Sequence, residues 1–340
     1  MPDEQGPLLA ALEGVDRLLL LGDVLELRHG PLRRALEGAE PVLRRLGEAL
    51  GSDREVLIVP GNHDHMLLRA WFERRACASA PPPLGLSSEV DWRDGEPLAA
   101  VAAALRPARV RVLYPGVWLR GDVYASHGHY GDRHNTAPIV ERLGAGLMAR
   151  FVPERDGGPK RAEDYEATLA PIYAWVDAVA QGRAPDRDGD HGSLQVSIWR
   201  ELTGTGPRLS VRRAGLRAGF PMFVGALNRA RLGPLRADVS GPELRRGGLR
   251  GFSEVLGRLG VKARYAVFGH THRAGPLPDD EVAEWARPDG NSMINAGCWV
   301  REPKFLGPDP ARSPYRPGFC VLLEDGDGPP EVRNLLDQLS

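Results

Sequence analysis

The chain has 340 residues, which is enough for one large domain or two ordinary ones with a substantial core. Apolar residues make up 42% of the sequence and charged residues 26%, as in soluble globular proteins. The formal net charge of -1 excludes a global field that would attract nucleic acid or a membrane surface.

The first elements along the chain predict a βαβ unit. Residues 8–13 have a helical pattern, and residues 17–21 (RLLLL) are a short apolar run typical of a buried parallel strand. Residues 31–50 alternate apolar and charged positions at helical spacing despite Pro41, and residues 55–59 (EVLIV) form a second apolar run. Strand, helix and strand at this spacing predict parallel pairing with a right-handed crossover.

Strand-like and helical patterns continue along the chain. Residues 66–105 have a mostly helical pattern, which a proline-rich stretch interrupts. Residues 109–126 predict several short strands with turns at Pro115–Gly116 and Gly121–Asp122. Three further strand-like runs follow, at 264–272, 292–300 and 318–325.

We expect a single domain over residues 1–340, with a helical insertion or cap at 138–260. Helical segments such as 163–182 alternate there with glycine-rich and charged connectors. Residues 208–250 hold ten arginines against two acids. They predict either a cap that contacts an anionic or lipid-linked substrate or a membrane surface, or an ordinary packed helix with a solvated face. Residues 186–191 (DRDGDH) lack the glycine and closing glutamate of a calcium loop, which favours a solvated turn.

The cysteines, the amino-terminal residues and the lengths of the apolar runs indicate the cellular compartment. The three cysteines have neither the spacing of a metal site nor that of a disulfide framework. The amino-terminal residues lack the basic segment of a secretory signal, and no apolar run approaches the roughly 18 residues of a membrane span. We therefore expect a cytoplasmic protein.

Seven of the nine histidines fall into three groups, each at or just beyond the end of a strand-like run. Histidines placed only for packing would not be expected to gather there. Ligands of open α/β sheets bind at the carboxyl ends of strands, so the pattern predicts a site. The groups are His63 with His65; His127 with His129 and His134; and His270 with His272.

These strand ends offer oxygen and nitrogen donors without thiolates. Asp23 supplies a carboxylate, although that stretch alone favours a turn aspartate bonded to its own backbone. Asn62 supplies a neutral oxygen, and His127, His270 and His272 supply imidazoles. The set suits Mn, Fe, Zn or Ni rather than calcium or a structural zinc. Two such ions polarise a phosphoryl group and lower the pKa of a shared water to near neutral.

The loop after the second strand adds two residues for proton transfer. His63, next to Asn62, could donate a proton to a leaving oxygen. Asp64 could hold the ring of His63 in orientation.

Four motifs in this order resemble those of calcineurin-like metallophosphoesterases. They are GD at 22–23, GNHD at 61–64, HGH at 127–129 and GHTH at 269–272. GNHD combined with GHTH, each after a buried strand, is highly specific, whereas GD alone has no weight and HGH little. The similarity runs from about residue 17 to 300, and the broader arrangement resembles the branch that includes UDP-2,3-diacylglucosamine diphosphatases. It implies a four-layer αββα sandwich, in which helices flank two mixed sheets.

The resemblance also implies the ligands of two divalent metal ions, for which manganese is favoured. Asp23 would bridge the ions. Asn62, His127 and His270 would complete one site, and His272 would belong to the other.

By the same resemblance, His63 would be the acid or transition-state stabiliser. His129 and Asp132 would lie behind the metal ligands or touch the substrate.

One family feature has no counterpart in this chain. The family begins with a strand that ends in Asp-x-His and supplies the other two ligands of the first metal. Nothing before Asp23 matches it, and no histidine precedes His29. We expect that the sequence begins late, rather than that half of a site has been lost, because every later motif is intact. The first metal site would be incomplete in this chain.

The expected activity is metal-dependent hydrolysis of a phosphoester or phosphoanhydride bond. The expected substrate is a phosphorylated small molecule or a lipid-linked one. Two alternatives remain: a catalytically impaired relative that serves as a scaffold, and a nuclease, whose binding would depend steeply on salt. The sequence carries no strong nucleic-acid signal and no trace of an oligomeric state.

Overall fold

The computed structural model describes residues 5–28, 30–135, 157–181, 224–225, 227–229, 241–303 and 305–337. They belong to two compact units, one made of Met1–His129 with Val261–Ser340 and the other of Tyr130–Gly260. The turn expected at 186–191 and most of the arginine-rich stretch 208–250 lie outside the described residues. None of the helices in the described part of the chain is long and apolar enough to cross a membrane.

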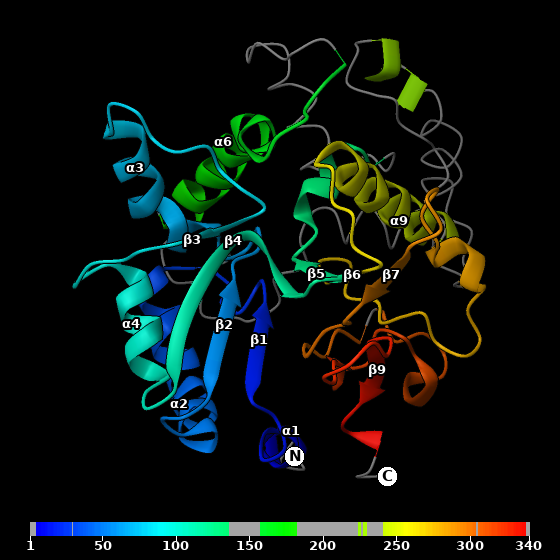
Figure 1. Cartoon of the computed structure of the whole chain (residues 1–340), viewed down its shortest axis with the longest axis horizontal. Coiled ribbons are helices and arrows are strands. Elements are labelled where there is room, and N and C mark those ends of the chain that lie inside the picture. The colour runs from blue at the N-terminus through cyan, green and yellow to red at the C-terminus, as the bar shows by residue number, and fades with distance from the viewer. Residues whose placement is uncertain are drawn as a thin grey trace, which may run out of the picture. The chain divides into compact units, whose positions relative to one another are not determined.

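The βαβ unit expected at the start of the chain is present in the first unit (Figure 1). β1 (Arg17–Leu21) pairs in parallel with β2 (Glu55–Val59) over all five residues, and α2 (Leu32–Leu50) connects them. The apolar stripe of α2 is buried through Leu43, Leu46 and Leu50. Gly47 lets α2 pack closely against the backbone at Leu105, because a Cβ at position 47 would lie 2.1 Å from the carbonyl oxygen of Leu105.

The chain then runs through one long strand rather than several short ones. β4 (Arg109–Arg120) pairs in parallel with β2, then with β3 (Ser87–Glu89) and finally with β5 (Val123–Ser126), both antiparallel. The prediction of a turn at Pro115–Gly116 is wrong, because β4 continues through these two residues and changes its partner strand there. Pro115 is opposite Ser87 of β3, and Gly116 is opposite Ser126 of β5. The expected turn at Gly121–Asp122 does separate β4 from β5.

The last strands complete a curled, mostly parallel sheet. β6 (Tyr265–Phe268) pairs with β5, and β7 (Ser292–Asn295) pairs with β6, both in parallel. The sheet has the order β1-β2-β4-β5-β6-β7, with β3 paired to β4 off this path. β8 (Phe319–Leu322) and β9 (Glu331–Asn334) form a separate antiparallel pair. The described chain is thus a mixed α/β fold.

The first unit also contains the helices between these strands. Residues 66–105 are helical in two pieces, with β3 between them, because that stretch pairs with β4. The remaining helices of this unit are α1 (Gln5–Leu12), α3 (Arg69–Cys77), α4 (Pro97–Ala104) and the short 3-10 helices η1 (His65–Leu68), η3 (Val282–Trp285) and η4 (Pro310–Arg312). The short helix η2 (His129–Arg133) leads into the second unit.

The second unit contains α6 (Ala162–Gln181) and α9 (Gly241–Arg258). α6 confirms the helix expected at 163–182. The rings of Tyr130 and Tyr165 stack at 4.8 Å, and the Tyr130 hydroxyl donates to Glu166 at 2.6 Å. The unit spans Tyr130–Gly260, against the 138–260 expected for an insertion.

Candidate metal centre

The expected ligands follow the carboxyl ends of β1, β2, β5 and β6. Three of the described non-glycine residues have a positive φ: Asp23 (53°), His270 (61°) and His272 (61°). This left-handed conformation costs roughly 1 kcal/mol or more for a residue with a side chain. Such strain is concentrated at functional sites, and here it falls on three residues that the sequence singles out as metal ligands.

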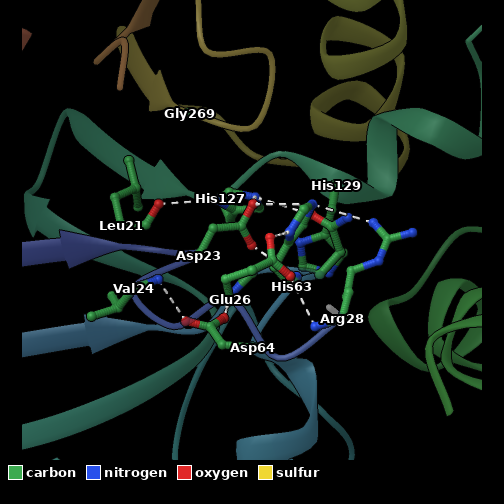
Figure 2. A network of polar contacts seen from close by, with 12 residues as sticks. Leu21, Asp23, Val24, Glu26, Arg28, His63, Asp64, His127, His129 and Gly269 are labelled. Carbon is green, nitrogen blue, oxygen red and sulfur yellow. Dashed lines mark hydrogen bonds and ion pairs between the residues drawn. The ribbon is translucent and has the colours of Figure 1, made fainter. Parts of the chain in front are cut away.

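Asp23 and His127 form the middle of the cluster (Figure 2). The Nε2 atom of His127 lies 3.0 Å from Oδ2 of Asp23 and 3.2 Å from Oδ1 of Asn62. The other ring nitrogen, Nδ1, lies 3.0 Å from the carbonyl oxygen of Leu21. Because a carbonyl only accepts, Nδ1 carries the proton, and in a neutral ring Nε2 then turns a lone pair toward two further acceptors.

A cation fits this donor set. Three lone-pair atoms that face one another repel unless a proton or a metal ion lies among them. His270 adds a fourth donor, since ligand atoms of Asp23, His127 and His270 all lie within 4.8 Å of one another. A carboxylate, an amide oxygen and two imidazoles suit a divalent transition metal such as Mn, Fe, Zn or Ni.

The electrostatics of Asp23 agree with a ligand role. Burial alone would raise the pKa of this carboxyl, but the interactions with the imidazole groups of His127, His63 and His270 hold its pKa well below the ordinary value. The carboxylate is therefore ionised at neutral pH. Its second oxygen, Oδ1, accepts a hydrogen bond from the backbone amide of His63 at 2.9 Å, which fixes its orientation.

Gly61 leaves room for these ligands. A Cβ at this position would lie 2.3 Å from Oδ1 of Asp23 and 2.7 Å from Cδ2 of His127. No side chain can therefore replace this glycine without displacing Asp23 or His127.

Replacing Gly61 with alanine should lower bound metal sharply and reduce the free energy of unfolding by about 1–3 kcal/mol, the usual cost of overpacking. Metal content per chain and thermal unfolding measure the two effects. Gly38→Ala is the matched control, because nothing lies within 4 Å of its Cβ position on α2. That variant should be neutral or more stable. Equal metal content in both variants would contradict the conclusion that Gly61 leaves room for the ligands Asp23 and His127.

Asp64 has a different role from the expected one. It is fully buried, and its oxygens accept hydrogen bonds from the backbone amides of Val24 (2.8 Å), Leu25 (3.4 Å) and Gly61 (2.7 Å). Burial and the charge of Asp23 raise the pKa of Asp64 to about 6. The carboxylate fastens the loops after β1 and β2 together instead of orienting the His63 ring, because backbone amides occupy its oxygens.

Glu26 holds the His63 ring in place of Asp64. The Nδ1 atom of His63 lies 2.6 Å from Oε2 of Glu26, and Nη1 of Arg28 lies 3.2 Å from Nε2 of His63 (Figure 2). Burial lowers the pKa of His63, but the bond to Glu26 and the charges of Asp23 and Glu26 outweigh it, so the pKa is raised. Sequence reasoning missed Glu26 and Arg28, although both follow Asp23 within five residues.

Replacing Glu26 with glutamine should lower the pKa of His63, because the variant loses a negative charge beside the ring. A reaction that needs protonated His63 loses rate as pH rises through that pKa. The alkaline limb of the pH–rate profile should therefore move to lower pH, with metal content unchanged. Glu48→Gln, an exposed change on α2, should leave the profile in place. An unmoved limb in the Glu26 variant would show that Glu26 does not tune His63.

The remaining predicted residues lie at different distances from the cluster. His129 is buried behind His127, with ring centroids 5.7 Å apart, and its Nε2 lies 3.0 Å from the hydroxyl of Tyr114. Burial, with the charges of His127 and His270, holds the pKa of His129 well below its ordinary value, so the ring is neutral. Asp132 is buried in the second unit, and its place in the site stays a prediction.

His272 is a neutral donor close to the cluster. Burial lowers its pKa to about 4, while the charge of Asp23 acts in the opposite direction. It lines one cavity together with Asp23, His127 and His270. A neutral imidazole in this place is available as a metal ligand.

Asn295 positions the loop that carries His270 and His272. It is fully buried at the end of β7, and its Nδ2 donates to the carbonyl oxygen of Gly269 and to Oγ1 of Thr271, both at 2.8 Å. Sequence reasoning missed this residue. The available signal was a polar residue inside the strand-like run 292–300.

Comparisons with models of known protein families, with curated proteins and with solved structures find no match. The site itself is therefore the basis for a functional proposal.

Proposed function

We propose that this protein is a metal-dependent phosphoesterase, which hydrolyses a phosphomonoester, phosphodiester or pyrophosphate bond with a metal-activated water. The proposal includes a calcineurin-like αββα sandwich as the complete fold. One observation carries it: Nε2 of His127 lies 3.0 Å from Oδ2 of Asp23 and 3.2 Å from Oδ1 of Asn62. In the same unit, the carboxylate of Glu26 holds the ring of His63.

The ligands divide between two ions. Asp23, Asn62, His127 and His270 would hold one divalent ion, for which manganese is favoured. Asp23 and His272 would contribute to a second. When bound, such ions polarise a phosphoryl group and make water a nucleophile at neutral pH.

The protein's own residues would supply the proton and orient the substrate. His63 would donate a proton to the leaving oxygen, and Glu26 would hold the ring for that transfer. In the described arrangement Arg28 donates to Nε2 of His63. A phosphate oxygen could take over that guanidinium, because Arg binds phosphate through paired N–H donors, and Nε2 would then be open to a proton.

The test measures metal content and turnover on one sample. The purified chain, loaded with Mn²⁺, is assayed with bis(4-nitrophenyl) phosphate and with single-stranded DNA over a range of salt concentrations. We expect bound metal and turnover of the small diester that a chelator abolishes and Mn²⁺ restores. Absence of both bound metal and turnover would favour the scaffold alternative. Cleavage of DNA alone, with a steep salt dependence, would favour a nuclease.

A further inference from the structure

The loop after β6 carries two of the predicted metal ligands in a strained backbone conformation. His270 and His272 both have a φ of 61°. A residue with a side chain keeps this left-handed conformation only where surrounding contacts enforce it. Asn295 supplies contacts on the amino side of His272, through the carbonyl oxygen of Gly269 and Oγ1 of Thr271. The carboxyl side of His272 needs a separate anchor.

A buried ion pair lies on that carboxyl side. Arg273 directly follows His272, and its guanidinium donates to both carboxylate oxygens of Asp280, with 2.9 Å between Nη1 and Oδ2. The side chains of Arg273 and Asp280 are only 11% and 8% exposed. A guanidinium and a carboxylate that pair through two bonds fix each other's orientation, so Asp280 determines where the Arg273 side chain lies.

Further contacts tie this pair to the surrounding backbone. Nη1 of Arg273 also donates to the carbonyl oxygen of Ala274 at 3.0 Å, and Oδ2 of Asp280 accepts from the amide of Leu277 at 2.8 Å. The guanidinium lies 5.6 Å from the ring centroid of Trp285, which is buried in η3. The pair therefore differs from an exposed surface ion pair, whose two long side chains rarely fix a backbone.

The segment that follows Arg273 is also hydrogen-bonded to two other parts of the unit. The amide of Gly275 donates to the carbonyl oxygen of Asn295 at 3.1 Å, and the amide of Asn295 donates back at 2.7 Å. The amide of Ala274 donates to the carbonyl oxygen of Pro314 at 2.9 Å. A Cβ at Gly275 would lie 2.4 Å from the ring of Trp285, so the segment has no room to shift toward η3.

We propose that Asp280 is a positioning residue for the metal centre. Through Arg273 it holds the segment after His272, and so fixes the loop in the conformation that presents His270 and His272 to the other ligands. The inference rests on the proposed function, because it takes the two histidines as metal ligands. Residues that orient a ligand change metal affinity when they are replaced, although they do not bind the ion themselves.

The alternative is that the ion pair only stabilises the fold. A buried ion pair can often be replaced by apolar residues of similar volume without loss of stability. The double variant Arg273→Met with Asp280→Leu therefore separates the two roles. It leaves no buried charge without a partner, so it should unfold at about the wild-type temperature. It nevertheless lacks the two bonds that orient the loop.

The test compares the metal-free wild type with Asp280→Asn, the double variant and the control Asp279→Asn. The side chain of Asp279 is 91% exposed, and its replacement changes the net charge by the same amount as Asp280→Asn. We expect the amides of Ala274 and Gly275 to exchange about tenfold or more faster in the first two variants, relative to the amide of Leu57 in β2. The control should exchange at the wild-type rate.

The affinity for Mn²⁺, followed by the electron paramagnetic resonance of the free ion, is a second readout that involves no hydrolysis. We expect Asp280→Asn and the double variant to bind Mn²⁺ about 10–100-fold more weakly than the wild type. Asp279→Asn should bind it as tightly as the wild type. The double variant carries the test even if Asp280→Asn does not fold.

Three results would overturn the proposal. They are unchanged exchange of Ala274 and Gly275 in the double variant, wild-type Mn²⁺ affinity in a double variant of wild-type stability, and equal losses in Asp279→Asn, which would assign the effect to net charge. If the wild-type chain itself binds no Mn²⁺, the proposed function fails. Faster exchange in the Asp280 variants would then still support Asp280 as the anchor of this loop.

Discussion

Replacing Asp23 with asparagine should abolish metal binding at the cluster and, with it, phosphoester hydrolysis. The change removes the only carboxylate among the grouped donors of Asp23, His127 and His270. Loss of a residue that merely supports a metal ligand typically costs about 10–100-fold in metal affinity, so loss of a charged ligand should cost more. Metal content per chain and turnover of bis(4-nitrophenyl) phosphate are the two measurements.

Asp94→Asn is the matched control for this variant. Asp94 is exposed in a loop of the same unit, and its replacement changes the net charge by the same amount. The control should keep its metal and its activity. The ligand assignment fails if the Asp23 variant keeps wild-type metal content, or if both variants lose metal to the same extent.

Replacing His63 with glutamine should reduce kcat by about 10²–10⁴-fold, the range for loss of a positioned general acid. Metal content should be unchanged, because the predicted ligands are Asp23, Asn62, His127, His270 and His272. The loss should be greater for an alkyl phosphodiester than for a nitrophenyl one, since a good leaving group needs less protonation. Comparison of the two substrates separates proton donation from a merely structural effect.

Arg69→Gln serves as the control for the His63 variant. Arg69 begins α3 just beyond the same loop, and its side chain is 68% exposed. Replacing Arg69 should leave kcat unchanged for both the alkyl and the nitrophenyl phosphodiester. Equal losses on the two substrates in the His63 variant, or a loss of metal, would remove His63 from the role of acid.

The sequence by itself determined which segments form strands of the sheet and which side chains follow them. Apolarity of a short run is a local property, so the strands within the runs 17–21, 55–59 and 292–300 could be predicted one at a time, although the last is a strand only over Ser292–Asn295. Positions just after such runs, including Asp23, Asn62, His127 and His270, could then be expected to gather where the strands end. The structure brings these four together.

Sequence reasoning could not assign the partners of these side chains. Glu26 rather than Asp64 holds the His63 ring, because backbone amides of two loops occupy the carboxylate of Asp64. Asn295 supports a loop 24 residues before it in the chain. Such pairings depend on how separate loops meet in space, and no local sequence pattern encodes which loops come into contact.

Only the tertiary structure decided how the strands are joined. β4 continues through Pro115–Gly116 because its partners change there, although the two residues alone predict a turn. Likewise, the four leucines of 18–21 are locally typical of an interior strand, and only the pairing pattern shows that β1 pairs with β2 alone among the strands that the structure describes. The composition of a strand is local, whereas its neighbours are set by hydrogen bonds between segments far apart in the chain.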